Sequence, residues 1–272
     1  MHRRGAPPRE GCEGGALPRP GRLYAVVRVV AGLVLRTWFR LRVSGAEHLP
    51  AATGAIVAAN HKSFLDAFFL GLATDRPVHF MAKAELFKGP PAHLLPRLGA
   101  FPVRRGKADA DALATARAIL AAGGLVVVFP EGTRVDEPDA FGSPHHGAGR
   151  LALETGAPIV PTAILGTSRL WLGPVPKPRR IDVAFLAPVE AHAGDSAGDP
   201  RAALEELIDR RVWPAVQEEY GRLRATPGAI AAVLATLGLG GLAARRQLAR
   251  DRKPRLLGII EPRRRRRRKG RR

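Results

Sequence analysis

The sequence predicts an α/β fold with a mostly parallel central sheet that is covered by helices on both faces. Short runs rich in Val, Ile and Ala alternate with helical segments between residues 54 and 186, which is the βαβ pattern of a parallel sheet. The runs 54–59 and 125–129 are apolar throughout, as strands buried on both faces are. With 272 residues and 46% hydrophobic content, the chain suffices for one large α/β domain or two small ones.

The positive charge of the chain lies at its ends. The formal net charge is +20, of which residues 245–272 contribute +13 and residues 1–43 contribute +7, so residues 44–244 are neutral overall. A nucleic-acid-binding domain usually carries its positive charge on the folded surface. The distribution therefore argues against nucleic acid as a partner and favours an anionic membrane surface.

Three parts of the chain are predicted. Residues 1–22 mix Arg, Pro and Gly with few large apolar residues, so we expect a disordered leader. Residues 23–225 hold the predicted elements and form the folded domain. Residues 226–272 combine a weakly apolar stretch, whose entry into a membrane is left open, with a polybasic tail. The single cysteine, Cys12, offers no disulfide or thiolate metal site, which indicates a reducing cytoplasmic context.

The first predicted helix, residues 23–41, is apolar but contains Arg28, Arg36 and Arg40. That is too much charge for a helix that crosses a bilayer comfortably. Arginines together with Trp38 are typical of a helix that lies in the membrane interface. An amphipathic helix packed on the domain has the same pattern, so both interpretations stay open.

The remaining elements follow from length and composition. Helices are expected after residue 63, at 109–122, where acidic residues open the helix and two glycines close it, at 147–155 and at 201–223. Strands are expected at 54–59, 77–83, 98–106, 125–129, 158–165 and 181–186.

His61 and Asp66 are the candidate catalytic pair. Both follow the buried strand 54–59, and ligands of α/β folds bind beyond the carboxyl ends of such strands. An imidazole can take a proton from an alcohol near neutral pH, and a carboxylate can orient it. The pair requires His61 to lie before the next helix, with Ser63 as N-cap and Asp66 in the first turn. In the alternative interpretation Asp66 only caps the helix and His61 is a loop residue.

A second polar stretch, residues 130–134, follows the buried strand 125–129 and should reach the same edge of the sheet. Gly132 permits close backbone approach to a ligand, and Thr133 and Arg134 can donate to phosphate oxygens. Arg105 lies at the end of another short predicted strand, 98–106, and offers a bidentate guanidinium. The adjacent residues His145 and His146 have no third ligand at metal-binding spacing, so no metal site is predicted.

Four blocks stand in order along the chain: Asn60-His61-x-Ser63-x-x-Asp66, Gly99-x-Phe101-x-Val103-x-Arg105, Phe129-Pro130-Glu131-Gly132-Thr133-Arg134 and Val160-Pro161. Together they resemble the glycerolipid acyltransferase family, which includes the 1-acylglycerol-3-phosphate acyltransferases, over roughly residues 23 to 190. Arg104 and Val135 depart from residues that are frequent in the family, which leaves the acceptor open.

The resemblance implies a role for each block. His61 is the base and Asp66 its partner, and Pro161 lies near the acyl donor. The residues assigned to substrate binding are Asn60, Ser63, Arg105, Glu131, Gly132, Thr133, Arg134 and Pro161.

The implied reaction is direct acyl transfer from acyl-CoA or an acyl-carrier-protein thioester to a lysophosphatidate-type acceptor, on the cytoplasmic face of the cell membrane. The sequence has no Gly-x-Ser-x-Gly elbow and no usable cysteine for an acyl-enzyme, and a thioester needs no cofactor. Condensation-type acyltransferases use paired histidines, whereas Asn60 occupies the place of the first. Glycerol 3-phosphate or another lysophospholipid as acceptor stays open, as does a basic membrane or nucleic-acid-binding protein without catalysis.

Overall fold

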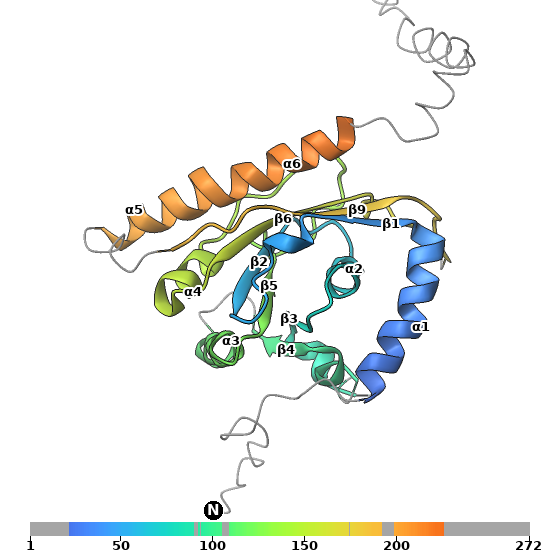
Figure 1. Cartoon of the computed structure of the whole chain (residues 1–272), viewed down its shortest axis with the longest axis horizontal. Coiled ribbons are helices and arrows are strands. Elements are labelled where there is room, and N and C mark those ends of the chain that lie inside the picture. The colour runs from blue at the N-terminus through green and yellow to red at the C-terminus, as the bar shows by residue number, and fades with distance from the viewer. Residues whose placement is uncertain are drawn as a thin grey trace, which may run out of the picture. The chain divides into compact units, whose positions relative to one another are not determined.

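The computed structural model describes residues 22–89, 92, 94–104, 109–173, 175–191 and 199–225. A seven-stranded sheet with the order β1-β9-β6-β2-β5-β3-β4 forms its centre (Figure 1). All neighbouring strands are parallel except β6 and β9. The strands are β1 Leu41–Ser44, β2 Ala55–Ala59, β3 Val78–Lys83, β4 Ala100–Val103, β5 Leu125–Val128, β6 Ile159–Leu165 and β9 Ile181–Phe185.

Helices cover both faces of the sheet, as predicted, because the central strands present apolar side chains to each side. In β2, Val57 packs toward α1 and α2, whereas Ile56 packs toward α3 and α4. Figure 1 shows these two pairs of helices on opposite sides of the sheet. The helices are α1 Arg22–Phe39, α2 Asp66–Ala73, α3 Ala110–Ala121, α4 Gly147–Thr155, α5 Pro200–Leu204 and α6 Trp213–Ala225, with 3₁₀ turns η1 Ala46–His48, η2 Ala84–Phe87 and η4 Pro96–Leu98.

The predicted helix 201–223 is divided. A π-helical segment, η6 Glu205–Val212, separates α5 from α6. Pro214 follows at the start of α6, and proline offers no N–H for a helical hydrogen bond and crowds the carbonyl four residues before it. A wider helical turn before Pro214 relieves that crowding.

Three strands were not predicted. Strand β1 is an exposed edge strand with the sequence Leu-Arg-Val-Ser, so it shows no buried apolar run. Strands β7 Trp171–Leu172 and β8 Val175–Pro176 form a separate antiparallel pair too short for a periodic signal. The predicted leader, residues 1–22, lies outside the described residues except for Arg22, and residues 226–272 lie outside them entirely.

Helix α1 packs on the domain along one side. Its inner side meets α2, where Phe39 contacts the Phe69 ring edge to face at 5.2 Å and the Arg36 guanidinium donates to the Leu72 carbonyl at 3.0 Å. Its outer side carries a stripe of apolar side chains that are 45–70% exposed. The stripe consists of Val26, Val29, Val30, Leu33, Val34 and Trp38. No helix within the described ranges is long and apolar enough to cross a membrane.

Candidate active site

His61 and Asp66 form the predicted pair at the carboxyl end of β2. His61 Nδ1 lies 2.9 Å from Asp66 Oδ2, and the backbone N–H groups of Lys62 and Ser63 donate to the same oxygen at 2.7 Å each. Because Nδ1 faces the carboxylate, the ring carries its proton there and Nε2 is left as the base. The loop between β2 and α2 thus winds around Asp66, which fixes the tautomer that proton abstraction needs.

The predicted helix cap is wrong in one detail. Helix α2 begins at Asp66 and Leu65 precedes it as N-cap, without a side-chain cap. The Ser63 hydroxyl instead accepts the backbone N–H of Leu65 at 3.3 Å. Asp66 is the first residue of the helix, and its side chain accepts hydrogen bonds from the backbone of the loop before it. The Ser63 side chain therefore does not cap this helix.

Asn60 fastens the end of β2 to β6. Its side-chain N–H₂ donates to the Ile164 carbonyl at 2.9 Å, and its carbonyl oxygen accepts the Ile164 N–H at 2.8 Å. Asn60 is fully buried. This two-way bond holds the backbone directly before His61, which is a positioning role; the predicted substrate contact stays a prediction.

The two polar stretches meet at one edge of the sheet, as predicted. The His61 ring stacks on Phe129, at the end of β5, with centroids 4.0 Å apart and planes inclined by 17°. The Val135 N–H donates to the His61 carbonyl at 2.8 Å. Gly132 has φ +67, and a Cβ there would lie 2.9 Å from the His145 ring, so only glycine fits this turn without strain.

The Glu131 carboxyl faces inward, beneath this edge. Glu131 is 4% exposed, and neither carboxyl oxygen has a partner at hydrogen-bonding geometry among the residues that the structure describes. Burial raises the pKa of Glu131 to about 7, against the opposing effect of the Lys62 ammonium and of the nearby backbone N–H groups of His61 and Gly142. Glu131 therefore titrates near neutral pH, whereas a surface carboxylate titrates at a lower pH.

Lys62 is the cation that lowers the pKa of Glu131, and its side chain is buried, with only 2% of the residue exposed. Its ammonium donates to the carbonyls of Glu137, at 2.9 Å, and Ala140, and lies 4.6 Å from the centroid of the Phe141 ring. Burial lowers the pKa of Lys62, and Glu131 and Asp66 oppose that shift. Lys62 thus ties the loop that carries His61 to the loop that follows Arg134.

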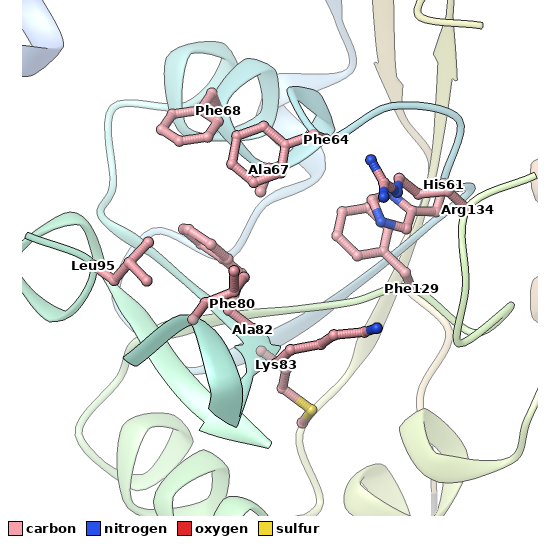
Figure 2. Close-up of a pocket in the computed structure, with 12 residues that line it drawn as sticks. His61, Phe64, Ala67, Phe68, Phe80, Ala82, Lys83, Leu95, Phe129 and Arg134 are labelled. Atoms are coloured by element: carbon pink, nitrogen blue, oxygen red, sulfur yellow. The ribbon is translucent and has the colours of Figure 1, made fainter. Parts of the chain in front are cut away.

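A cavity of about 130 Å³ opens beside His61. Figure 2 shows the Lys83 and Arg134 side chains on the His61 side of it and the Phe64, Phe68 and Phe80 rings on the other. Arg134 is exposed and has no acidic partner among the residues described. The side of the cavity that carries His61 therefore suits an anionic group, and the opposite side suits an apolar chain.

Comparison with known proteins finds similarity to acyltransferases. The family model described as Acyltransferase matches residues 40–165. Over 130 residues the chain is 34% identical to the 1-acyl-sn-glycerol-3-phosphate acyltransferase of Bacillus subtilis (strain 168), covering 47% of this chain and 64% of that protein. The chain therefore carries an acyltransferase-family domain at residues 40–165. The chloroplastic 1-acyl-sn-glycerol-3-phosphate acyltransferase LPAT1 of Arabidopsis thaliana is 30% identical to this chain over 151 residues, which are 54% of this chain and 42% of that protein.

A solved structure shares the fold. The 1-acyl-sn-glycerophosphate (LPA) acyltransferase PlsC from Thermotoga maritima superposes with a TM-score of 0.60 at 26% identity, over 76% of this chain and 81% of that chain. The predicted resemblance to acyltransferases and the mostly parallel α/β fold are confirmed. The chain spans less than two thirds of the length of either curated relative named above.

Some predicted site residues do not line the cavity, and one of them lies outside the described residues. Arg105 lies outside the described residues. Its neighbour Arg104 pairs with Asp109 and Asp111 and is thus engaged with acids. Pro161 is buried within β6 beside Ala58 of β2. Thr133 is exposed, on the turn between Gly132 and Arg134.

Lys83 was missed by sequence reasoning. It is the last residue of β3, which was predicted as a strand, and its neighbour β5 runs parallel to it. Because parallel strands end at the same edge, the side chain that follows the last apolar position could have been expected there. Within the described ranges, no group of three or more His, Cys, Asp or Glu side chains is placed to hold a metal ion.

Proposed function

We propose that this protein transfers an acyl group from acyl-CoA or an acyl-carrier-protein thioester to the free hydroxyl of 1-acylglycerol 3-phosphate, giving phosphatidic acid. The observation that carries the proposal is the cavity, which has the His61 imidazole and two cations on one side and a group of phenylalanine rings on the other (Figure 2). A lysophosphatidate presents an anionic phosphate and an apolar chain on either side of its free hydroxyl. The named relatives, which are 1-acyl-sn-glycerol-3-phosphate acyltransferases, support the same acceptor.

The chemistry needs one proton relay. His61 Nε2 takes the proton of the acceptor hydroxyl, and Asp66 stabilises the resulting imidazolium through Nδ1. The alkoxide-like oxygen attacks the thioester carbonyl carbon, and the C–O bond forms as the C–S bond breaks. The imidazolium returns its proton to the departing thiolate. We propose that no cofactor or metal ion takes part, since the thioester supplies the driving force.

Two cations are available for the acceptor phosphate. Lys83 and Arg134 both line the cavity on the side of His61 (Figure 2). Arginine offers a planar fork for two phosphate oxygens, whereas lysine offers a point charge. We assign the phosphate grip to this pair, with Arg105 as a third contributor on the grounds of the resemblance.

Association with an anionic membrane surface, on its cytoplasmic face, is part of the proposal. The exposed apolar stripe of α1 supports it, because a soluble monomer seldom exposes six large apolar side chains in one row. The basic ends of the chain add electrostatic attraction to anionic lipid.

The test is an acyl-transfer assay on the purified full chain. Radiolabelled acyl-CoA and acyl-carrier-protein are offered with a panel of acceptors: lysophosphatidate, glycerol 3-phosphate, lysophosphatidylcholine and lysophosphatidylglycerol. We expect labelled phosphatidic acid as the main product. Faster transfer to an acceptor without a terminal phosphate monoester would overturn the assigned acceptor, and no transfer to any acceptor would overturn the activity.

A further inference from the structure

A short antiparallel ribbon, β7 with β8, projects large apolar side chains into solvent. Trp171 is 47% exposed, Leu172 70% and Val175 53%. The ribbon forms a sheet of its own, separate from the central sheet. Isolated two-stranded ribbons are marginal in water, and three large apolar groups on one of them add no core of their own. Their exposure indicates an external apolar environment.

The ribbon adjoins the apolar stripe of α1. Trp38, the last residue of that stripe, donates its indole N–H to the Pro176 carbonyl at 2.9 Å. Trp38 is itself 45% exposed. The stripe and the ribbon are therefore neighbouring parts of one apolar surface, linked by a side-chain bond between residues 138 positions apart.

The charges around the ribbon are positive. The segment 169–180 contains four basic residues and no acidic one. Arg169 pairs with Glu137 and Arg180 pairs with Asp182. The other two bind neutral carbonyls: Lys177 donates to the Arg169 carbonyl at 3.3 Å, and Arg179 donates to the Ser168 carbonyl at 2.9 Å. Neither of these two positive charges, which lie next to the exposed apolar groups, is paired with an acid in the described part of the chain.

We propose that the β7–β8 ribbon is a second membrane-inserting element, which enters an anionic bilayer interface beside α1. An apolar tip flanked by tryptophan and by basic side chains matches the acyl boundary and the headgroup layer of such a bilayer. A protein partner would more often present acids to these cations and would leave the tryptophan fully buried. The inference rests on the proposed membrane association of the enzyme.

The position of the ribbon has a consequence for the site. The Arg169 N–H donates to Asp136 Oδ1 at 2.8 Å, and its guanidinium pairs with Glu137 at 2.7 Å. These two acids stand two and three residues after Arg134, which lines the cavity. Insertion of the ribbon therefore brings the rim of the cavity to the bilayer surface, where a lysophospholipid acceptor resides.

The experiment compares two double variants of the full chain. Trp171→Ser with Leu172→Ser removes the apolar tip, and Trp171→Phe with Leu172→Ile keeps it. Binding to phosphatidylglycerol-containing vesicles is measured in about 0.5 M salt, where the Debye length is only a few ångströms and the basic ends contribute little. We expect the serine variant to bind on the order of tenfold more weakly, because two large apolar side chains no longer enter lipid. The phenylalanine variant should bind as the wild type does.

Quenching by brominated lipids reports the ribbon directly. Trp213 is buried, so the quenched emission of the wild type should come from Trp38 and Trp171, and Trp171→Phe should remove the Trp171 share. Unchanged binding of the serine variant, or unchanged quenching in Trp171→Phe, would overturn the proposal that the ribbon inserts into the bilayer. Loss of self-association in place of vesicle binding would assign the surface to a second protein copy instead. Equal binding to uncharged vesicles at low salt would overturn the assigned lipid charge.

Activity on a water-soluble short-chain acceptor separates this inference from the proposed function. The serine variant should keep wild-type turnover on such an acceptor, because Trp171 and Leu172 do not line the cavity. If the wild type itself transfers nothing to any acceptor, the proposed function fails. The vesicle measurements still decide whether the ribbon inserts into the bilayer.

Discussion

Asp66 and Glu131 are both buried carboxylates, and each lies just beyond the end of a central strand. Asp66 holds one oxygen against three donors, the His61 ring and two backbone N–H groups, whereas neither oxygen of Glu131 has a partner at hydrogen-bonding geometry among the described residues. Burial raises the pKa of Glu131 to about 7. Two acids in similar places thus differ in their hydrogen-bond donors: those around Asp66 orient the His61 ring, whereas Glu131 lacks such donors and the effect of its burial prevails.

The largest expected effect is that of Asp66→Asn. An amide in this place can donate to Nδ1 and so favours the wrong tautomer of His61, which removes the base at Nε2. We expect kcat to fall by about 10³–10⁴-fold with little change in the melting temperature. Steady-state acyl transfer and circular dichroism measure the two quantities. A kcat near that of the wild type would show that Asp66 does not orient the ring.

Lys62→Met should destabilise the fold. It removes the ammonium that offsets Glu131 and that donates to the carbonyls of Glu137 and Ala140. We expect a loss of about 2–4 kcal/mol in the free energy of unfolding at pH 8. Adding Glu131→Gln should restore part of it, because no buried anion then remains to be offset. An effect of Glu131→Gln that is the same in the Lys62→Met background as in the wild type would contradict coupling between the two side chains.

Glu131→Gln should stabilise the fold at high pH. The folded pKa of Glu131, about 7, lies above the ordinary value of 4.5, so the folded state binds the proton more tightly than the unfolded state. The wild type therefore loses stability as the pH rises from about 4.5 to about 7. Glutamine does not titrate, so the variant should gain about 2–3 kcal/mol over the wild type at pH 8 and close to nothing at pH 4.5. Denaturant unfolding across this range checks it, and a gap that stayed constant with pH would refute the raised pKa.

Arg134→Lys should raise the acceptor KM. Lysine keeps the charge but loses the bidentate fork, and a charged hydrogen bond is worth about 1.5–3 kcal/mol, so a rise of about tenfold is expected while the donor KM stays unchanged. Arg104→Lys is the matched control, because Arg104 pairs with Asp109 and Asp111 and should leave both KM values unchanged. Arg105→Lys applies the same assay to the role that the resemblance gives to Arg105. A rise in the donor KM alone would assign Arg134 to the donor.

The sequence was sufficient for the parts of this site that depend on order along the chain. Strand 54–59 is apolar throughout and ends at a polar stretch, which located His61 and its edge of the sheet. The spacing of five residues required His61 to lie before the helix, and Asp66 is indeed the first helical residue. The alternation of arginines with apolar residues predicted helix α1 but left open whether it lies in a membrane interface or packs on the domain, and the exposed stripe became visible only in the structure.

What the sequence did not reveal depends on contacts between distant segments. The inward direction of the Glu131 carboxyl and its relation to Lys62 follow from the packing of Phe141 and Tyr220 around the lysine. The two-way bond of Asn60 to Ile164 joins residues 104 positions apart. The β7–β8 ribbon has two residues in each strand, which is too few for any periodicity to show.

The central claim is that His61 Nε2 is the base of the acyl transfer. The most direct measurement is the turnover of purified His61→Ala under saturating thioester and lysophosphatidate, with acceptor binding and melting temperature recorded alongside. The account predicts a fall in kcat of about 10²–10⁴-fold, the typical cost of losing a positioned base, with binding and folding retained. A folded His61→Ala protein that turns over at close to the wild-type rate would contradict it.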